Sequence, residues 1–322
     1  MTLSPMMELR GEAARRLGCE LECLDPETGY LHEVRKGDQR HLLLGGTSPL
    51  NDALASRLAE DKFHTALLVR RAGMRVPDTV RCLRPGSFPQ EDFSSHRGLA
   101  PAQAFATEKG WPLVVKPNRG SRGRSVSVVQ GPESLERAID EVWEDDYLAL
   151  VQTPAPGMDV RLDLLDGEYL LGYTRQGVML EGDGKSSVAE LLAASDPRFT
   201  GELFWRGLQD DPLLQGLQPD AVPGAGETLD LRTPILNLNR LCHGQILPDP
   251  PAGLLDVARR AGEALGLRHC GVDLKVLSLD APAEDAVVIE VNSSPSLVHM
   301  GRLGHREDAV AAEMRVVGAM LG

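Results

Sequence analysis

Three oxygen-bearing side chains near the C-terminal end of the chain have a spacing that suits magnesium. Asp273 ends the sequence Cys-Gly-Val-Asp, and Glu290 and Asn292 lie in the apolar run 287–292. This run predicts a buried strand, on which residues two apart point to the same face. The strand that contains Asp273 is a candidate neighbour. Two carboxylates and an amide oxygen form the hard ligand set that magnesium completes with water and phosphate oxygens; the alternative is carboxylates on a solvent-facing edge strand.

A second group of residues suits the binding of phosphate. Lys116 ends the expected strand 112–116, and a Gly-rich basic loop with the sequence Asn-Arg-Gly-Ser-Arg-Gly-Arg-Ser follows at 118–125. Small residues let backbone N–H groups approach an anion, and arginines add charge-assisted hydrogen bonds. The loop is not a P-loop, because no Gly-Lys-Ser/Thr opens a helix after it. A basic, solvated hairpin turn is the alternative.

Two arginines further along the chain are candidates for contact with a phosphoryl group. Arg161 begins an expected strand two residues after Asp159, and Arg232 follows Asp230 at the same spacing. A guanidinium group recognises phosphate oxygens through several fixed N–H donors. Taken singly, each arginine is better explained as a structural residue on the surface.

The composition indicates a globular protein with room for two or three domains. Of its 322 residues 42% are hydrophobic and 25% charged, which is usual for this class. Aromatic residues make up only 4% and the formal charge is −13, which together argue against a nucleic-acid partner. The five cysteines form no CxxC pair, and there is neither a signal peptide nor an apolar run of about 18 residues. We expect reduced thiols, a cytoplasmic location and no membrane partner.

Local patterns predict a mixed α+β protein with several lobes. Ser48 and Pro49 have the residue types that open a helix, as N-cap and first helical residue. The proline-bearing stretch 84–103 reads as a loop. Asp166-Gly167 predicts a two-residue hairpin turn, and Ser187 with Glu190 a capping box. Further helices are expected at 62–72, 132–141 and 254–265, and further strands at 41–44, 125–129 and 148–151.

In this order the segments resemble those of the ATP-grasp superfamily. Lys62 and the segment 71–77 resemble the part that leads into the nucleotide lobe, and Lys116 with its loop resembles the lysine strand and glycine loop. The stretches 181–191, 219–223 and 226–232 resemble the ATP-grasp parts of cyanophycin synthetase and bifunctional glutathione synthetase. The resemblance implies a small N-terminal α/β unit followed by two α+β lobes that clasp ATP. It divides the chain into 1–75, a nucleotide lobe at 76–155 and a large lobe with the metal site at 156–322.

The activity that this resemblance implies is that of an ATP-dependent carboxylate–amine ligase. ATP converts a carboxylate of an amino acid or peptide to an acyl phosphate, and an amine then displaces phosphate to form an amide bond. Such enzymes use a pair of magnesium ions, which manganese can replace, and small amino-acid or peptide substrates. The resemblance is also compatible with a homodimer. The alternatives are a small-molecule kinase of the same fold and a non-catalytic ATP-binding regulatory subunit.

The resemblance also implies a role for each candidate residue. The expected metal ligands are Asp273, Glu290 and Asn292, and the expected catalytic residues are Arg161, Arg232 and Lys116. The expected ATP-binding residues are Lys62, Lys116, Gly120, Ser121, Arg122, Gly123, Gln152 and Asp159. Candidate substrate contacts are Ser294, His299 and Arg302, although ordinary loop and helix-start roles explain each of them as well.

Three positions depart from the pattern of the resembling enzymes. Gln152 stands where these relatives usually carry a glutamate, and its side-chain oxygen can still accept from an adenine amino group. Gly271 stands where ligases of the D-alanine type carry an arginine, so that arginine has to come from elsewhere in the chain. The segment 233–244 differs from the glycine-containing loop of the relatives, which predicts a different substrate.

Overall fold

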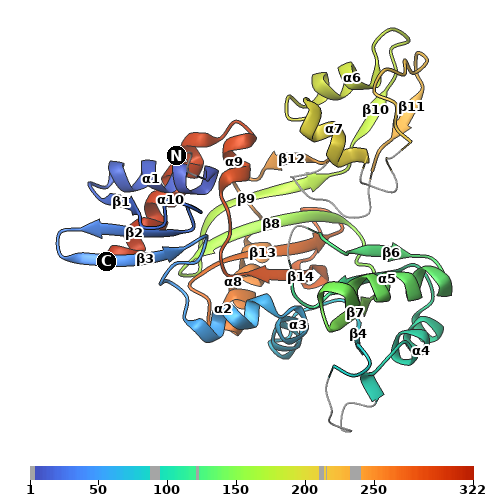
Figure 1. Cartoon of the computed structure of the whole chain (residues 1–322), viewed down its shortest axis with the longest axis horizontal. Coiled ribbons are helices and arrows are strands. Elements are labelled where there is room, and N and C mark those ends of the chain that lie inside the picture. Colours follow the sequence, from blue (N-terminus) through green and yellow to red (C-terminus); the bar gives the residue numbers. More distant parts are fainter. Residues whose placement is uncertain (1–3, 88–94, 121–122, 210–213, 215, 233–240) are drawn as a thin grey trace. The chain divides into compact units, whose positions relative to one another are not determined.

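The computed structural model describes residues 4–87, 95–120, 123–209, 214, 216–232 and 241–322. The chain forms two compact units, one made of Met1–Tyr173 together with Leu247–Gly322 and the other of Thr174–Ile246 (Figure 1). The three-part division inferred from the sequence stays a prediction. None of the helices in the described ranges is both long and apolar enough to cross a bilayer.

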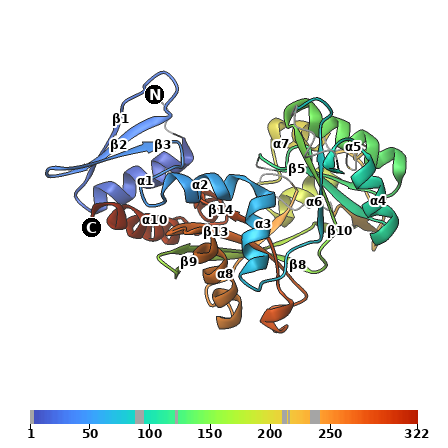
Figure 2. The same ribbon diagram turned by 90° about the horizontal axis from the view of Figure 1, so that it is seen from below.

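The N-terminal part of the first unit is a helix on a small antiparallel sheet. Helix α1 (Pro5–Arg16) precedes the strands β1 (Glu20–Cys23), β2 (Leu31–Lys36) and β3 (Gln39–Leu44), which pair in the order β1-β2-β3. Helix α1 packs beside the last helix, α10 (Arg306–Leu321), in both ribbon views (Figures 1 and 2). The two helices share an ion pair between Arg10 Nε and Glu313 Oε2 at 3.0 Å, and both side chains are fully buried. The two ends of the chain are thereby joined in one core.

The next two helices begin at aspartate caps. Helix α2 (Ala53–Glu60) starts after Asp52, whose carboxylate accepts a hydrogen bond from Ala55 N at 2.7 Å. The prediction that Ser48 and Pro49 open this helix is therefore wrong, because the Asp52 cap starts it a turn later. Helix α3 (Lys62–Arg71) matches the predicted helix and is capped by Asp61, which accepts from His64 N at 3.0 Å.

A four-stranded antiparallel sheet follows, in the order β4-β7-β5-β6. Its strands are β4 (Thr79–Leu83), β5 (Leu113–Pro117), β6 (Ser127–Val129) and β7 (Leu148–Gln152). Helices α4 (Ala100–Lys109) and α5 (Pro132–Asp145) bury Ala102 and Ile139 in its core. The prediction of a loop through residue 103 is wrong at its end, because α4 already begins at Ala100. Its proline lies in the first helical turn, where a missing N–H breaks no hydrogen bond.

The large antiparallel sheet runs β9-β8-β13-β14 within the first unit. Strands β8 (Met158–Leu165) and β9 (Glu168–Gln176) form the predicted hairpin, in which Asp166 and Gly167 both have positive φ. Strands β13 (His269–Val276) and β14 (Val287–Asn292) complete it, and helices α8 (Ala252–Leu265) and α3 pack with it in one core. The short helices η2 (Ala283–Asp285) and α9 (Val298–Arg302) follow β13 and β14.

The second unit has a hydrophobic core of its own. It contains β10 (Met179–Glu181), α6 (Val188–Ser195), α7 (Glu202–Gln209), β11 (Thr228–Asp230) and β12 (His243–Ile246). Strands β10 and β11 pair with each other, and β12 pairs with β9. The predicted capping box is confirmed, with Ser187 and Glu190 bonded reciprocally at the start of α6. Most of the divergent segment 233–244 lies outside the described residues.

Replacing Arg10 with Met should lower the free energy of unfolding by about 3–5 kcal/mol, because Glu313 would keep a buried charge without its counter-charge. The double variant Arg10→Met, Glu313→Leu should recover most of that loss, since an apolar pair often replaces a buried ion pair at little cost. Urea unfolding of the wild type and both variants measures this. Equal losses in the two variants would show that packing, not charge, links α1 to α10.

Candidate functional site

The pairing of three neighbouring strands brings the predicted metal ligands together. In the β13–β14 pair, Asp273 lies opposite Glu290 and Gly271 lies opposite Asn292. On the other side of β13, Arg161 of β8 lies opposite Asp273. Residues that face each other across antiparallel strands have neighbouring side chains. The strand that carries Asp273 is therefore the neighbour that the sequence analysis expected.

Asp273 is held by partners from both adjacent strands. Arg161 Nη1 donates to Asp273 Oδ2 at 2.7 Å, and Asn292 Nδ2 donates to the same oxygen at 3.1 Å. Arg161 Nε also donates to Asp163 Oδ1 at 2.6 Å. Burial opposes the charge of Arg161, but Asp273 and Asp163 outweigh it and raise the pKa of the guanidinium above its ordinary value. Arg161 is therefore a permanent cation between two carboxylates.

Gly271 leaves the space that the Arg161 side chain fills. A Cβ atom at residue 271 would lie 1.9 Å from Arg161 Nη2 and 2.4 Å from Asp163 Oδ1. No side chain at residue 271 fits beside these atoms unless they move. The guanidinium group of Arg161, on β8, thus lies where a side chain of residue 271 would begin. The sequence has no arginine at residue 271, and the structure places the guanidinium group of Arg161 there from another strand.

One lysine pairs with the carboxylate of Glu290, and a second lies within electrostatic range of it. Lys62 Nζ, at the start of α3, lies 3.2 Å from Glu290 Oε1 and donates to the carbonyl of Gly120 at 2.7 Å. Lys116, on β5, is buried. Its burial, with a contribution from Lys62, lowers the pKa of its amine to about 8, although Glu290 and Asp273 favour the charged form. We call the assembled residues the charged cluster: Lys62, Lys116, Arg161, Asp163, Asp273, Glu290 and Asn292.

Asn118, for which the sequence predicted no role of its own, fixes the base of the Gly-rich loop. Its side-chain oxygen accepts from Phe63 N at 3.0 Å, and its carbonyl accepts from Lys62 N at 3.1 Å. These bonds attach the loop to the first turn of α3, whose N–H groups have no partner within the helix. The signal in the sequence was the asparagine at the start of the loop, but its partners are more than 50 residues away in the chain.

The other predicted nucleotide contacts have partners of their own. Gln152, buried at the end of β7, donates to Thr79 Oγ1 at 2.8 Å. Asp159 accepts from Lys275 Nζ at 2.6 Å across the β8–β13 pair. Gly123 is in a turn of the loop, whereas Ser121 and Arg122 lie outside the described residues. Their roles toward a nucleotide stay predictions.

The candidate substrate contacts follow β14, and a residue from the N-terminal part supports the start of this segment. The amide of Asn51 donates to the carbonyls of His269 and Ser293 at 2.7 and 2.8 Å. Its oxygen accepts from Arg268 N and His269 N at 2.9 and 3.0 Å. Asn51 thus joins the start of β13 to the segment that continues into Ser294.

The remaining candidates lie on other elements. His299 is partly buried in α9, and Arg302 ends the same helix, although its side chain is not among the described ones. Arg232 belongs to the second unit and pairs there with Asp230 at 2.6 Å. None of these three is assigned a role by the geometry.

The donor set of the charged cluster fits magnesium. Asp273, Glu290 and Asn292 offer oxygen atoms from two adjacent strands, and magnesium completes such a set with water and phosphate oxygens. In the described part of the chain no three His, Cys, Asp or Glu side chains gather as a metal-binding group. Asp273 and Glu290 supply only two carboxylates, so a metal there would also need the amide oxygen of Asn292 and oxygens from a ligand.

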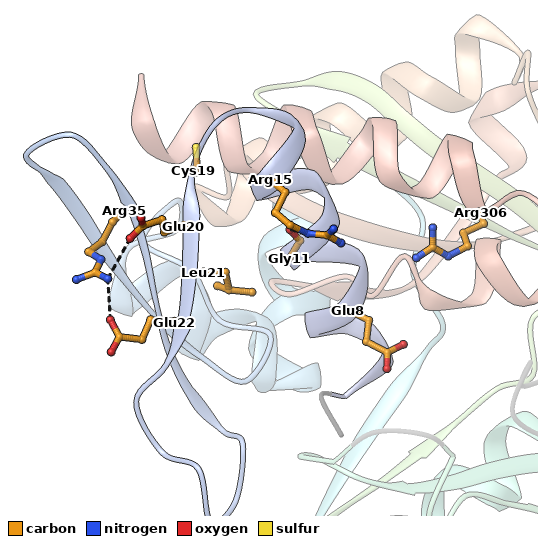
Figure 3. Close-up of a pocket in the computed structure, with 9 residues that line it drawn as sticks. All are labelled: Glu8, Gly11, Arg15, Cys19, Glu20, Leu21, Glu22, Arg35 and Arg306. Atoms are coloured by element: carbon orange, nitrogen blue, oxygen red, sulfur yellow. Dashed lines mark hydrogen bonds and ion pairs between the residues drawn. The ribbon is translucent and has the colours of Figure 1, made fainter. Parts of the chain in front are cut away.

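A large surface recess lies elsewhere in the first unit. Its volume is about 740 Å³, and it is lined by residues of α1, β1, β2 and the start of α10 (Figure 3). It contains none of the candidate site residues. Arg35, which lines it, already pairs with Glu20 and Glu22 at 3.1 and 2.9 Å. The recess is therefore not a candidate site of the same kind as the charged cluster.

The chain is similar in sequence to two kinds of biosynthetic protein, although no family model matches it. The glutathione biosynthesis bifunctional protein GshAB of Mannheimia succiniciproducens is 26% identical over 322 aligned residues, 91% of this chain and 40% of the relative. Cyanophycin synthetase of Crocosphaera subtropica is 28% identical over 75% of this chain and 28% of the relative. The chain thus spans two fifths or less of these relatives' length.

A solved structure shows the same fold. The bifunctional glutathione synthetase from Pasteurella multocida matches 87% of this chain and 39% of its own, with a TM-score of 0.54 and 23% sequence identity. The predicted α+β class and ATP-grasp fold are confirmed, as is the resemblance to bifunctional glutathione synthetase and cyanophycin synthetase.

Gly271→Ala should lower the free energy of unfolding by about 1–3 kcal/mol, because the new methyl group has to displace Arg161 or Asp163. The control is Gly318→Ala in α10, where a Cβ meets nothing within 4 Å. This change should be neutral or stabilising, since alanine favours a helix. Thermal unfolding compares them; equal stability of the two variants would contradict the close approach of Arg161.

Proposed function

We propose that this ATP-grasp protein is an ATP-dependent carboxylate–amine ligase that forms an amide or peptide bond and releases ADP and phosphate. The observation that carries the proposal is the charged cluster, in which Lys62, Lys116 and Arg161 surround the oxygen ligands of Asp273 and Glu290. Phosphoryl transfer requires positioning and charge neutralisation rather than a protein nucleophile. The relatives named for glutathione biosynthesis and cyanophycin synthesis support this class of reaction.

The oxygen atoms of Asp273, Glu290 and Asn292 would hold magnesium, which would supply positive charge to neutralise phosphate oxygens. A pair of ions is expected, and manganese can replace them. Asn292 can present its amide oxygen while Nδ2 stays on Asp273. The residues needed for this are already neighbours on β13 and β14.

The lysines would bind the polyphosphate of ATP. Lys62 and Lys116 are the cations beside Glu290, and the loop from Gly120 to Gly123 follows the same strand as Lys116. Gln152 would accept from the adenine amino group. Asp159 would accept from the ribose hydroxyls, after exchanging part of its contact with Lys275.

The reaction would proceed in two displacements. A substrate carboxylate oxygen attacks the γ-phosphorus of ATP, ADP leaves, and an acyl phosphate forms. The amine nitrogen then attacks the acyl carbon, phosphate leaves, and the nitrogen loses a proton to solvent or to phosphate. Arg161 would neutralise the negative charge that develops in both steps. Arg232 is proposed to stabilise the transferring phosphoryl group or the tetrahedral intermediate, and Ser294, His299 and Arg302 are the proposed substrate contacts.

The substrates proposed for the chain are amino acids or short peptides. We also propose that it acts in the cytoplasm, without nucleic acid or membrane, and forms a homodimer. The alternative functions are a small-molecule kinase of the same fold and a non-catalytic, ATP-binding regulatory subunit.

Orthophosphate release from ATP and magnesium, measured with a panel of amino acids and short peptides singly and in pairs, tests the proposal. We expect release only with a particular acid–amine pair, and loss of that release in Glu290→Gln, which removes a ligand charge but keeps the side-chain shape. Lys36→Met, at the exposed end of β2, should behave as the wild type. Formation of ADP with one compound and no free phosphate would indicate the kinase instead. Undiminished release by Glu290→Gln would show that the metal assignment is wrong.

A further inference from the structure

Asp163 is a buried carboxylate in the charged cluster that the sequence analysis did not single out. It lies two residues after Arg161 on β8, so both side chains project from the same face of the sheet. In the β8–β13 pair Asp163 lies opposite Gly271, just as Arg161 lies opposite Asp273. Only 2% of its surface is exposed. A charge buried to this extent is costly unless it is paired.

Arg161 pairs with two carboxylates, and only one of them is a proposed metal ligand. Its Nη1 reaches Asp273 at 2.7 Å and its Nε reaches Asp163 at 2.6 Å. Asp273 also lies opposite Glu290 and accepts from Asn292, so it belongs to the oxygen set that fits magnesium. Asp163 lies two residues further along β8, opposite Gly271, and β13 separates it from the strand that carries Glu290 and Asn292. Of the two carboxylates, only Asp273 belongs to the proposed metal ligands.

The two cations at Asp273 compete. A carboxylate that binds magnesium gives up part of its interaction with a guanidinium, because both cations seek the same lone pairs. Arg161 is buried and keeps its charge, so it needs another counter-charge when this happens. Asp163 supplies one that does not depend on the metal. Gly271 completes the arrangement, since a Cβ atom there would lie 1.9 Å from Arg161 Nη2 and 2.4 Å from Asp163 Oδ1 and would displace one of them.

We propose that Asp163 is a positioning residue that keeps Arg161 in the charged cluster while Asp273 is free to bind magnesium. This inference rests on the proposed function, because it assumes that Asp273 is a metal ligand. Without the Asp163 charge, Arg161 depends on Asp273 alone and competes more strongly with the metal. Asp163 thus acts on metal affinity through Arg161, without touching the metal.

The test is the binding of Mn²⁺ in the presence of a non-hydrolysable ATP analogue, measured by the loss of the free-ion signal in electron paramagnetic resonance. Asp163→Asn keeps the shape of the side chain and an oxygen that can accept from Arg161 Nε, but removes the charge. We expect its affinity for Mn²⁺ to fall by between about tenfold and about a hundredfold, as is usual when a partner of a metal ligand is changed. Turnover with the substrate pair should fall as well, with the KM for ATP little changed.

A double variant separates positioning from a merely structural role. In Asp163→Asn, Arg161→Met both of these buried charges are removed, and the guanidinium no longer competes with the metal for Asp273. We expect this variant to bind Mn²⁺ at least as tightly as the wild type, although its turnover should be lost with Arg161. Asp196→Asn is the matched control, because Asp196 pairs with Arg198 at the same two-residue spacing in the second unit. Its Mn²⁺ affinity should be unchanged.

The outcomes distinguish this inference from the proposed function. Equal Mn²⁺ affinity in the wild type and a folded Asp163→Asn would overturn the role of Asp163 and leave the metal site intact. Weak binding in both the single and the double variant would overturn it too, because it would show a general need for Asp163 in packing. No Mn²⁺ binding by the wild type would overturn the proposed metal site, and the inference with it.

Discussion

The register of β8, β13 and β14 is the constraint on which the candidate site depends. It places Arg161 opposite Asp273 and Asp273 opposite Glu290, in one row across three strands. Residues next to them along the strands, such as Val160 and Val272, point to the other face. There they pack in one core with residues of α8 and α3. A shift of one residue would exchange the two faces and bury the charges in the apolar core. The hydrophobic face thus fixes the position of the polar one.

An irregularity in the sheet occurs at the site itself. The β13–β14 register shifts between Asp273 and Leu274, so that Leu274 pairs with Val288 while Asp273 pairs with Glu290. Bulges of this kind re-aim side chains and are frequent near functional sites. Here the shift lets one strand bury its valines and still present Glu290 and Asn292 beside Asp273.

Charge balance explains how this row can exist in a buried place. The cations Lys62, Lys116 and Arg161 face the anions Asp163, Asp273 and Glu290 at short distances or within electrostatic range. Burial still costs Lys116 enough to lower its pKa to about 8, so the balance is incomplete there. Magnesium and a polyphosphate carry opposite charges, and together they can exchange with the resident partners without leaving a buried charge unpaired.

The local parts of this architecture could be predicted from the sequence. The Asp166-Gly167 turn, the Ser187 capping box and the spacing of Glu290 and Asn292 each depend on residues a few positions apart. The start of α2 was missed because two capping signals compete within a few residues, and the side chain of Asp52 is the one that bonds. The contacts of Asn118 and Asn51 were not visible, because their partners come from distant segments. Asp163 lies only two residues from Arg161, but its place opposite Gly271 and beside Asp273 depends on strand register.

The measurement that tests the central claim most directly is a crystal structure of the chain with a non-hydrolysable ATP analogue and Mn²⁺, with the metal located from its anomalous scattering. The account predicts an anomalous peak bound by oxygens of Asp273 and Glu290, with the phosphates beside Lys62 and Lys116. A metal held by other side chains, or a nucleotide bound away from these lysines, would contradict it.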